Sequence, residues 1–302
     1  MLKHWIKLGA LLGVLAALAG CSATQAINML VPSDTYRLTP DVAYGPQARQ
    51  LLDVYQPKGE PPEGGFPVVV FFYGGTWHMG ERAQYRFMGE ALAAHGMVAM
   101  VADYRLYPVA YPDFLPDCAR AVAYALNESP RYSGNQRRVV VMGHSAGAYN
   151  AAMVALDPRW LKQQGHQVSE LAGWVGLAGP YDFIPIEDPQ TRETFHHPAV
   201  PPDSQPIRHV SAKAPRTFLG VAKEDKQVNP DRNSAQLAER LQAAGVPVEF
   251  KRYDHVGHIS LVGSFAQPLR WLSPALREVS AFVKSLPPVP AGQAHLATKG
   301  PP

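Results

Sequence analysis

The segment 139–148, Val-Val-Val-Met-Gly-His-Ser-Ala-Gly-Ala, constrains the fold of this chain more than any other feature. Its apolar start has the composition of a buried strand, and the residues after it have the pattern of a helix. Ser145 lies at the junction between Gly143 and Gly147, where any Cβ would crowd the neighbouring strand or helix. The segment therefore predicts a tight strand-to-helix turn that carries an exposed serine hydroxyl.

A turn of this kind is typical of sites that use serine as a nucleophile. The hydroxyl is a poor nucleophile at its ordinary pKa, so it must stand clear of the backbone where a histidine can reach it. The start of the new helix would present the N–H of Ala146 to a developing oxyanion. Gly-x-Ser-x-Gly also occurs by chance, and the alternative interpretation is a plain Gly/Ser turn in a doubly wound sheet. The flanking strand and helix favour the nucleophile elbow.

The N-terminal residues have the pattern of a targeting segment. Lys3 and Lys7 flank the start of an apolar run at 8–19, which is too short to span a bilayer comfortably. The run ends in Leu-Ala-Gly-Cys, which resembles the lipobox of bacterial lipoproteins. That resemblance implies cleavage after residue 20 and acylation of Cys21. Ser22, at the next position, is similar to the pattern of lipoproteins that are sorted to the outer membrane, on its periplasmic side. The alternative is an ordinary secretory signal or a short anchor.

This resemblance sets the expected domain boundaries. We expect a signal peptide at 1–20, a tether at 21–34, one α/β domain at 35–286 and a disordered tail at 287–302. The tail is rich in proline and glycine and has no apolar period, so it has nothing to bury.

Charge and cysteine content exclude several classes of protein. The chain has 28 Lys and Arg against 25 Asp and Glu, and without Lys3 and Lys7 the balance is 26 to 25. Such a neutral chain gives no reason to expect a nucleic-acid partner. If Cys21 is acylated, Cys118 has no partner for a disulfide, and its helical context predicts a buried apolar role.

Between the ends, short apolar runs alternate with helical patterns, which indicates βαβ units and a mainly parallel sheet of about eight strands with helices on both faces. The predicted central strands are 68–73, 97–102, 138–142, 172–177, 217–221 and 248–253, with an antiparallel lead-in at 36–38 and 50–55. The predicted helices are 84–94, 116–126, 146–156, 233–243 and 271–285. Ligands bind beyond the carboxyl ends of the strands in such sheets, so chemistry is expected in the loops that follow them.

Four segments in this order resemble the α/β-hydrolase fold, in the carboxylesterase branch that includes feruloyl-esterase-like and arylformamidase-like enzymes. They are Leu-Asp-Val-Tyr at 52–55, Tyr-Gly-Gly-Thr-Trp at 73–77, Asp-Tyr-Arg-Leu at 103–106 and the elbow. The resemblance covers roughly 51–285. It implies a serine hydrolase of small or medium carboxylic esters, aryl esters included, that works without a cofactor.

The glycine-rich loop departs from that family at one position. Tyr73 stands where the family usually has a histidine that braces the loop, which puts the loop's hydrogen bonding in question. By resemblance, the oxyanion donors are the N–H groups of Gly75 and Thr76, joined by Ala146. For Trp77, a substrate-facing role and a core role remain open.

The base and the acid must follow Ser145 in the order that α/β-hydrolases use. His166, His196, His197 and His209 fall in helix ends or loops and are expected to be solvated. His255 and His258 follow the strand 248–253, and Gly257-His258 resembles the family's Gly-His pair, so His258 is the predicted base. The spacing of these two histidines also suits a metal pair, but no convincing third ligand lies nearby and no metal is expected.

The predicted acid is Asp225, in the loop after the strand 217–221. Asp225, followed by two residues and then Val228, is similar to the family's acid loop, in which the valine packs inward and fixes the direction of the carboxylate. Glu224 is the close alternative and Asp231 a distant one. Asp182, after the strand before, is expected to be structural or to line the pocket.

The remaining expectations concern substrate and place. The partners are a small ester substrate and a membrane, through a lipid anchor at Cys21. The segment 180–207 is rich in proline, aromatics and charge and is expected to be an insertion that forms a lid. Two alternatives stay open, an arylformamidase or amidase acting on a substrate such as N-formylkynurenine, and a non-catalytic binding lipoprotein on a hydrolase scaffold.

Overall fold

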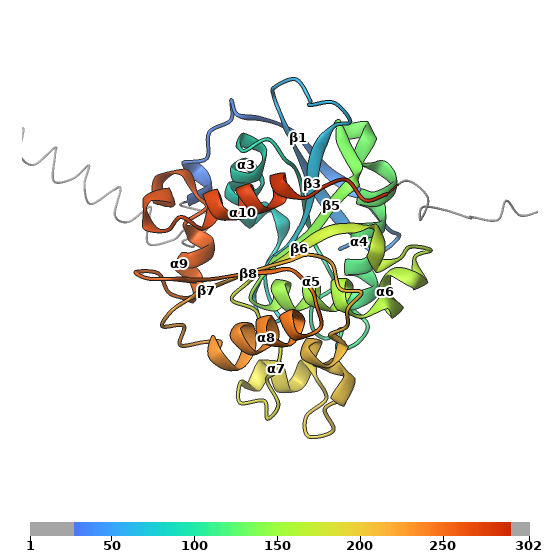
Figure 1. Ribbon diagram of the computed structural model, residues 1–302, viewed down its shortest axis with the longest axis vertical. Coiled ribbons are helices and arrows are strands. Elements are labelled where there is room, and N and C mark those ends of the chain that lie inside the picture. The colour runs from blue at the N-terminus through green and yellow to red at the C-terminus, as the bar shows by residue number, and fades with distance from the viewer. Residues whose placement is uncertain (1–26, 291–302) are drawn as a thin grey trace, which may run out of the picture.

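An eight-stranded sheet separates two layers of helices in the computed structural model, which describes residues 27–290 (Figure 1). The strand order is β1-β2-β4-β3-β5-β6-β7-β8; β1 pairs antiparallel with β2 and β2 with β4, and the other neighbours are parallel. The mainly parallel α/β fold predicted above is therefore confirmed. The strands are β1 Tyr36–Ala43, β2 Leu51–Pro57, β3 Phe66–Phe72, β4 Val98–Ala102, β5 Gly134–His144, β6 Leu171–Leu177, β7 Thr217–Ala222 and β8 Val248–Tyr253.

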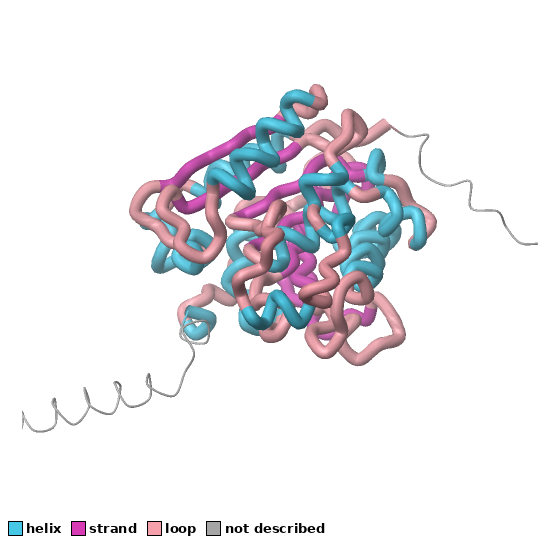
Figure 2. Tube along the Cα trace, turned by 90° about the horizontal axis from the view of Figure 1, so that it is seen from below, coloured by secondary structure: helices cyan, strands magenta, loops and turns pink. Residues whose placement is uncertain are grey.

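Helices cover both faces of the sheet. Figure 1 shows α3 and α10 together on one side of the sheet, and α4, α5, α6 and α8 on the other, and Figure 2 shows helices on both sides of the strands. The helices are α3 Arg86–Ala94, α4 Leu115–Glu128, α5 Ala146–Leu156, α6 Pro158–Gln163, α7 Pro189–Thr194, α8 Gln236–Ala243, α9 His258–Gly263 and α10 Ala275–Ser285.

The central strands are buried on both faces, which explains their continuous apolar runs. Every residue of β3, β4 and β6 is buried. β3 lies between β4 and β5, with Val69 opposite Ala99 on one side and Val140 on the other. Because these strands run parallel, the loops that follow β3, β5, β7 and β8 all leave the same edge of the sheet.

The helix that follows the elbow is the most deeply buried element of the second layer. All eleven residues of α5 are buried, and most of them are alanine, glycine or other small side chains. Small side chains let the helix axis approach β5 and β6 closely, so the position of its first turn is tightly fixed. The elbow is therefore supported by the core itself.

The sequence did not predict the short helices α6, α7 and α9, each of six residues. A helix of fewer than two turns gives no measurable apolar period. The last helix was predicted from residue 271, but α10 begins at Ala275 after a 3₁₀ turn, Gln267–Leu272, and after Pro274. His166, expected in solvent, is buried, with its Nδ1 2.9 Å from Glu170 Oε2.

Both ends of the described chain lie against the domain. Of the expected tether at 21–34, the part from residue 27 packs beside α3, where Asn28 donates to the Ala83 carbonyl oxygen at 2.8 Å and accepts from the Phe87 N–H at 3.2 Å. Val289, in the expected tail, pairs with the backbone of Arg137 at 2.8 Å. The predictions for 1–26, which include Cys21, and for 291–302 lie outside the described residues.

Cys118 is fully buried in α4, as expected, and burial raises the pKa of its thiol well above the ordinary value. Among residues 27–290, no helix is long and apolar enough to cross a membrane. The same part of the chain contains no cluster of His, Cys, Asp and Glu that could hold a metal ion.

Candidate active site

Ser145 sits between β5 and α5 in a strained backbone conformation, with φ 55° and ψ −123°. The two flanking glycines are required by close contacts. A Cβ on Gly143 would lie 2.0 Å from the Gly147 oxygen, and one on Gly147 would lie 2.0 Å from the Phe72 oxygen. The N–H of Ser145 donates to the Leu177 carbonyl oxygen at 2.9 Å, which ties the turn to β6. The predicted elbow is present, with its hydroxyl at the edge of the sheet.

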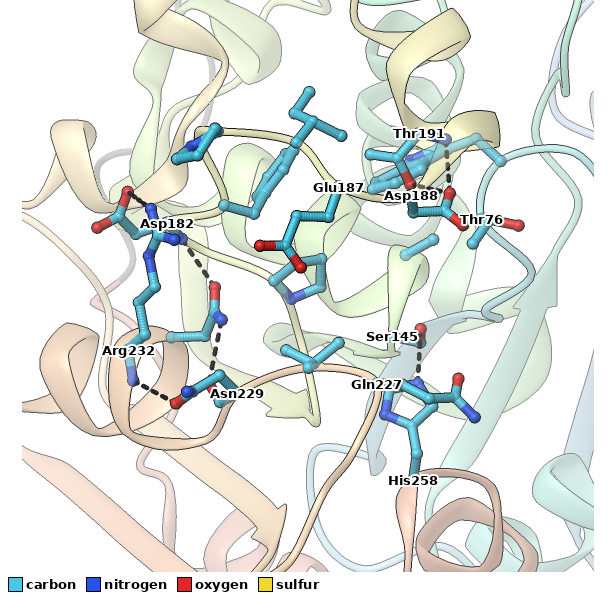
Figure 3. A pocket seen from close by; sticks show the side chains of 18 residues that line it. Thr76, Ser145, Asp182, Glu187, Asp188, Thr191, Gln227, Asn229, Arg232 and His258 are labelled. Carbon is cyan, nitrogen blue, oxygen red and sulfur yellow. Dashed lines mark hydrogen bonds and ion pairs between the residues drawn. The ribbon is translucent and has the colours of Figure 1, made fainter.

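Ser145, His258 and Asp225 form one hydrogen-bonded chain across three loops (Figure 3 shows Ser145 and His258). His258 Nε2 lies 2.8 Å from Ser145 Oγ, and His258 Nδ1 lies 2.7 Å from Asp225 Oδ2. The histidine and the aspartate are only 6% and 8% exposed, so both side chains are largely shielded from water. The order serine, histidine, carboxylate is that of a nucleophile, its base and the group that orients the base.

The carboxylate of Asp225 is held in its ionised form. Burial alone would raise its pKa, but the hydrogen bond and charge of His258, with the N–H groups of Val228 and Gln227, lower the pKa below the ordinary value. Those N–H groups donate to Asp225 Oδ1 at 3.0 and 2.8 Å. An ionised Asp225 makes Nδ1 of His258 the donor, so Nε2 is free to accept the Ser145 proton. The backbone of Val228 thus orients the carboxylate, where the sequence pattern suggested its side chain.

The alternative partners are not brought to Ser145. Glu224 and His255 are exposed, and His255 has a left-handed φ of 63° in the loop before His258. Asp231 forms an ion pair with Arg252. Asp182 lies at the far end of the pocket.

The loop after β3 passes directly over the elbow. A Cβ on Gly74 would lie 2.9 Å from Ser145 Cβ, so only glycine fits there. Gly75 and Thr76 have positive φ values of 126° and 49°, which turn the backbone back on itself. Within residues 27–290, the N–H groups of Gly75, Thr76 and Ala146 have no hydrogen-bond acceptor in the protein. Thr76 and Ala146 line the pocket beside Ser145, whereas Gly75 is not among its lining residues.

Tyr73, which replaces the family's histidine, braces this loop through its phenol. The hydroxyl donates to Asp103 Oδ1 at 2.6 Å and accepts from Arg49 at 2.7 Å. The same guanidinium group of Arg49 donates to the Gly80 carbonyl oxygen at 2.8 Å. Burial raises the pKa of Tyr73 far above its ordinary value, so the phenol stays neutral. The loop is therefore anchored at residue 73 and again at residue 80.

Two buried carboxylates, those of Asp53 and Asp103, extend this support. Arg82 donates to Asp53 Oδ1 at 2.9 Å, its backbone N–H donates to Asp103 Oδ1 at 2.8 Å, and its guanidinium group also binds Asp103 Oδ2. Sequence reasoning named 52–55 and 103–106 only as family segments and missed Arg49 and Arg82. No local pattern marks those two arginines, because their partners lie 21 to 55 residues away.

Trp77 serves the core and the pocket together. It is 2% exposed, and its indole N–H donates to Asn150 Oδ1 at 3.0 Å. Its ring packs edge-on against Tyr149 and Phe195, with centroids 5.1 and 4.9 Å away. Trp77 is also one of the residues that line the pocket.

His144, inside the elbow motif, is a residue whose role the sequence did not indicate. It is buried, and its Nε2 donates to the His258 carbonyl oxygen at 2.9 Å. Its Nδ1 has no partner among the described residues. Burial, and then the charge of His258, lower the pKa of His144 to about 3, so the ring is neutral at ordinary pH. His144 joins the elbow to the loop that carries His258.

The pocket beside Ser145 has a volume of about 590 Å³ and one wall from the expected insertion (Figure 3). We call residues 180–207 the cover segment; Pro180, Asp182, Phe183, Pro185, Ile186, Glu187, Asp188 and Thr191 line the pocket from it. Gln190 attaches this segment to the loop after β3, because its side-chain oxygen accepts from Thr76 Oγ1 at 2.8 Å. His78 Nε2 lies 3.0 Å from the Gln190 carbonyl oxygen.

An elbow serine after β5, a histidine loop after β8 and a mainly parallel sheet define the α/β-hydrolase fold. The chain belongs to the BD-FAE family, whose model matches residues 52–241.

Several curated proteins are similar to this chain. Isoprenylcysteine alpha-carbonyl methylesterase of Arabidopsis thaliana is 27% identical over 251 residues, which is 76% of this chain and 58% of that protein. Esterase LipC of Mycobacterium tuberculosis is 30% identical over 243 residues, 74% of this chain and 58% of LipC. Kynurenine formamidase of Danio rerio is 28% identical over 232 residues, 74% of this chain and 75% of that enzyme. The chain spans 58% of that methylesterase and 50% of a second, probable methylesterase of Arabidopsis thaliana that it also matches.

Solved structures share the fold. Butyrate-bound esterase 2 of Thermogutta terrifontis matches with a TM-score of 0.66 at 22% identity, over 83% of this chain and 94% of that one. A truncated carbohydrate esterase from gut microbiota matches with a TM-score of 0.67 at 18% identity, over 84% and 97%.

Proposed function

We propose that the protein hydrolyses carboxylic esters, with Ser145 as nucleophile, His258 as general base and acid, and Asp225 as the group that orients His258. The hydrogen-bonded chain from Ser145 through His258 to Asp225, beside a pocket of about 590 Å³, carries this proposal. Esterases among the similar proteins support it.

In the first half of the reaction, His258 Nε2 takes the proton of Ser145 as Oγ attacks the ester carbonyl carbon. The tetrahedral intermediate collapses when His258 gives that proton to the leaving alkoxide, which departs as the alcohol. Water then enters, loses a proton to His258 and attacks the acyl-serine. Oγ leaves with the proton, and the acid departs.

The negative oxygen of each intermediate requires donors that are already in place. Thr76, Ala146 and Gly75 supply the candidate N–H groups, because none of them has an acceptor within residues 27–290. Gly74 does not qualify, since its backbone is hydrogen-bonded to the hydroxyl of Tyr85, whose pKa burial raises to about 12. Removing one such donor typically costs about 2.7–4 kcal/mol of transition-state stabilisation.

The substrate class we propose is a small or medium acyl or aryl ester. The pocket volume suits a ligand of that size, and its lining mixes apolar and polar groups. Trp77 and Phe183, which stack with centroids 6.4 Å apart, supply an aromatic surface for an acyl or aryl group.

A second candidate reaction is hydrolysis of an aryl formamide, favoured by the similarity to kynurenine formamidase over 75% of that enzyme. The same three residues would attack a formyl carbon. Parallel assays with 4-nitrophenyl acetate and N-formylkynurenine distinguish the two. We expect a higher kcat/KM for the ester. If kcat/KM for the formamide were higher by several powers of ten, the ester proposal would be wrong.

Covalent labelling tests the nucleophile directly. A fluorophosphonate probe should label the wild-type protein and fail to label Ser145→Ala, while Ser169→Ala, a change at an exposed serine outside the elbow, should label normally. An unlabelled wild-type protein would instead support a binding lipoprotein on this scaffold.

We also propose that the mature protein is anchored through an acylated Cys21 at the bacterial envelope, on the periplasmic side of the outer membrane. The lipobox-like sequence at 18–21 supports this proposal. Each buried CH₂ of an acyl chain adds about 0.8 kcal/mol, so several chains would hold it firmly. Mass spectrometry should find an acylated N-terminal cysteine, and a chain that retains residues 1–20 would contradict it.

A further inference from the structure

The pocket beside Ser145 has an unequal charge lining. Three carboxylates face it, from Asp182, Glu187 and Asp188, against one guanidinium group, from Arg232. All three acids lie on the cover segment, and Figure 3 shows them along one side of the pocket with Ser145 and His258 on the other. The wall that the cover segment contributes to the pocket is therefore acidic.

Most of these charges already have partners. Arg232 lies 3.7 Å from Asp182 and also donates to the Ile184 carbonyl oxygen. Asp188 caps α7 by accepting from the N–H and Oγ1 of Thr191 at 2.7 and 2.8 Å. These contacts fix the positions of Asp182 and Asp188, and they give the guanidinium group of Arg232 its partners.

Glu187 differs from the other two acids. It has no hydrogen-bond or ion-pair partner within residues 27–290, and its carboxylate extends into the pocket between the Asp182–Arg232 pair and Ser145 (Figure 3). Arg192, the nearest cation in sequence, binds the Ile186 carbonyl oxygen and is not part of the lining. The charge of Glu187 is therefore available to a ligand.

We infer that the pocket selects its ester by charge, accepting cationic and neutral esters and rejecting anionic ones, with Glu187 as the residue that sets this preference. The inference rests on the proposed hydrolysis at Ser145. Glu187 is exposed, so salt screens its charge, but a carboxylate within a Debye length of the bound substrate still attracts a cation and repels an anion. The same field favours release of the acid that ester hydrolysis produces as an anion.

Three thioacetates of similar size test this preference. Acetylthiocholine is cationic, S-(3,3-dimethylbutyl) thioacetate is its neutral isostere, and S-acetyl-4-mercaptobutyrate is anionic. For the wild-type protein we expect kcat/KM to fall in that order, with about a fivefold cationic advantage over the neutral ester that shrinks as salt is raised. Glu187→Gln should bring the cation-to-neutral ratio close to one, and Glu187→Lys should reverse it.

Glu193→Gln is the matched control, because Glu193 is an exposed acid on α7 that does not line the pocket. It removes the same charge from the same segment and should leave the ratio unchanged. An equal ratio in wild-type and Glu187→Gln proteins, or an equal change in Glu193→Gln, would overturn the inference. Hydrolysis of phenyl acetate and labelling of Ser145 report the proposed function separately, since they use no charged substrate.

Discussion

The two walls of the pocket are built in different ways. On the side of the sheet, His258 and Asp225 are less than 10% exposed, and the hydrogen-bonding atoms of both side chains have fixed partners within the protein. The loop over the elbow is tied down by Tyr73 and Arg49. Backbone contacts that only glycine allows hold Ser145.

The cover segment is anchored by buried side chains such as Phe195, but several of its polar residues near Ser145 are exposed. Glu187, Asp188 and Gln190 are exposed, and Gln190 joins the segment to the sheet side through Thr76. Groups that must hold a reacting atom in place need rigid support, whereas groups that choose among substrates can lie in a surface segment. The comparison predicts that changes on the sheet side reduce kcat, and that changes in the cover segment alter KM or substrate preference.

The largest effect is expected for Asp225→Asn. The amide can still accept from Gln227 and Val228, but its NH₂ group favours the wrong tautomer of His258. We expect kcat for 4-nitrophenyl acetate to fall about 10³- to 10⁴-fold with little change in melting temperature. Asp231→Asn, at an exposed acid in the following turn, is the control and should stay within about twofold. A loss under tenfold in Asp225→Asn would argue against its role.

Next in size is a pH effect on stability at His144. Its pKa is about 3 in the folded protein and near 6.5 in an unfolded chain, so the unfolded state binds the proton first as pH falls. The stabilisation is complete above pH 6.5 and is lost progressively from there toward pH 3. The unfolding free energy should fall by about 2 kcal/mol between pH 7.5 and 5 from this residue alone.

His144→Gln isolates that contribution, because its amide can still donate to the His258 carbonyl oxygen and does not titrate. Chemical denaturation at pH 7.5 and pH 5 measures the difference between the two proteins, which cancels the other titrating groups. If the unfolding free energy changed equally between pH 7.5 and pH 5 in the wild-type and variant proteins, His144 would not remain neutral in the folded state.

A smaller effect is expected for Tyr73→Phe. The change removes a hydrogen bond to Asp103, which is buried and only 3% exposed, and one from Arg49. We expect about 1–3 kcal/mol of destabilisation and about a tenfold loss in kcat, because the loop that bears Gly75 and Thr76 is less well fixed. Tyr132→Phe loses only a bond to Tyr124 far from the pocket, and should lower stability without changing kcat. Equal kcat losses in both variants would contradict the bracing role.

The sheet side was the more predictable part of the molecule. The steric needs of Gly143 and Gly147 can be inferred from local sequence, and the strand 248–253 agrees residue by residue with β8. Ser145, Asp225 and His258 each follow a strand, and the parallel sheet brings those strand ends together. The choice of Asp225 over Glu224, and of His258 over His255, depended on the resemblance to the family.

The supporting contacts and the cover segment were less predictable. Arg49 reaches Tyr73 across 24 residues, and nothing local marks it as a partner. The cover segment has no apolar period, and α7 has only six residues, so its position depends on tertiary contacts such as the packing of Phe195 against Trp77. Glu187 is an ordinary acid in the sequence, and only its place in the pocket distinguishes it.

The smallest effect is expected for Gln190→Ala, which removes the bond from Thr76 Oγ1 but leaves the contact of His78 with the backbone of residue 190. Because an exposed hydrogen bond contributes little, we expect a two- to threefold rise in KM and an unchanged kcat, on the order of 0.5 kcal/mol. Glu193→Ala, on the same helix but outside the pocket, should change neither constant. A tenfold fall in kcat would show that the cover segment holds the Thr76 N–H in position, and the two walls would then act as one unit.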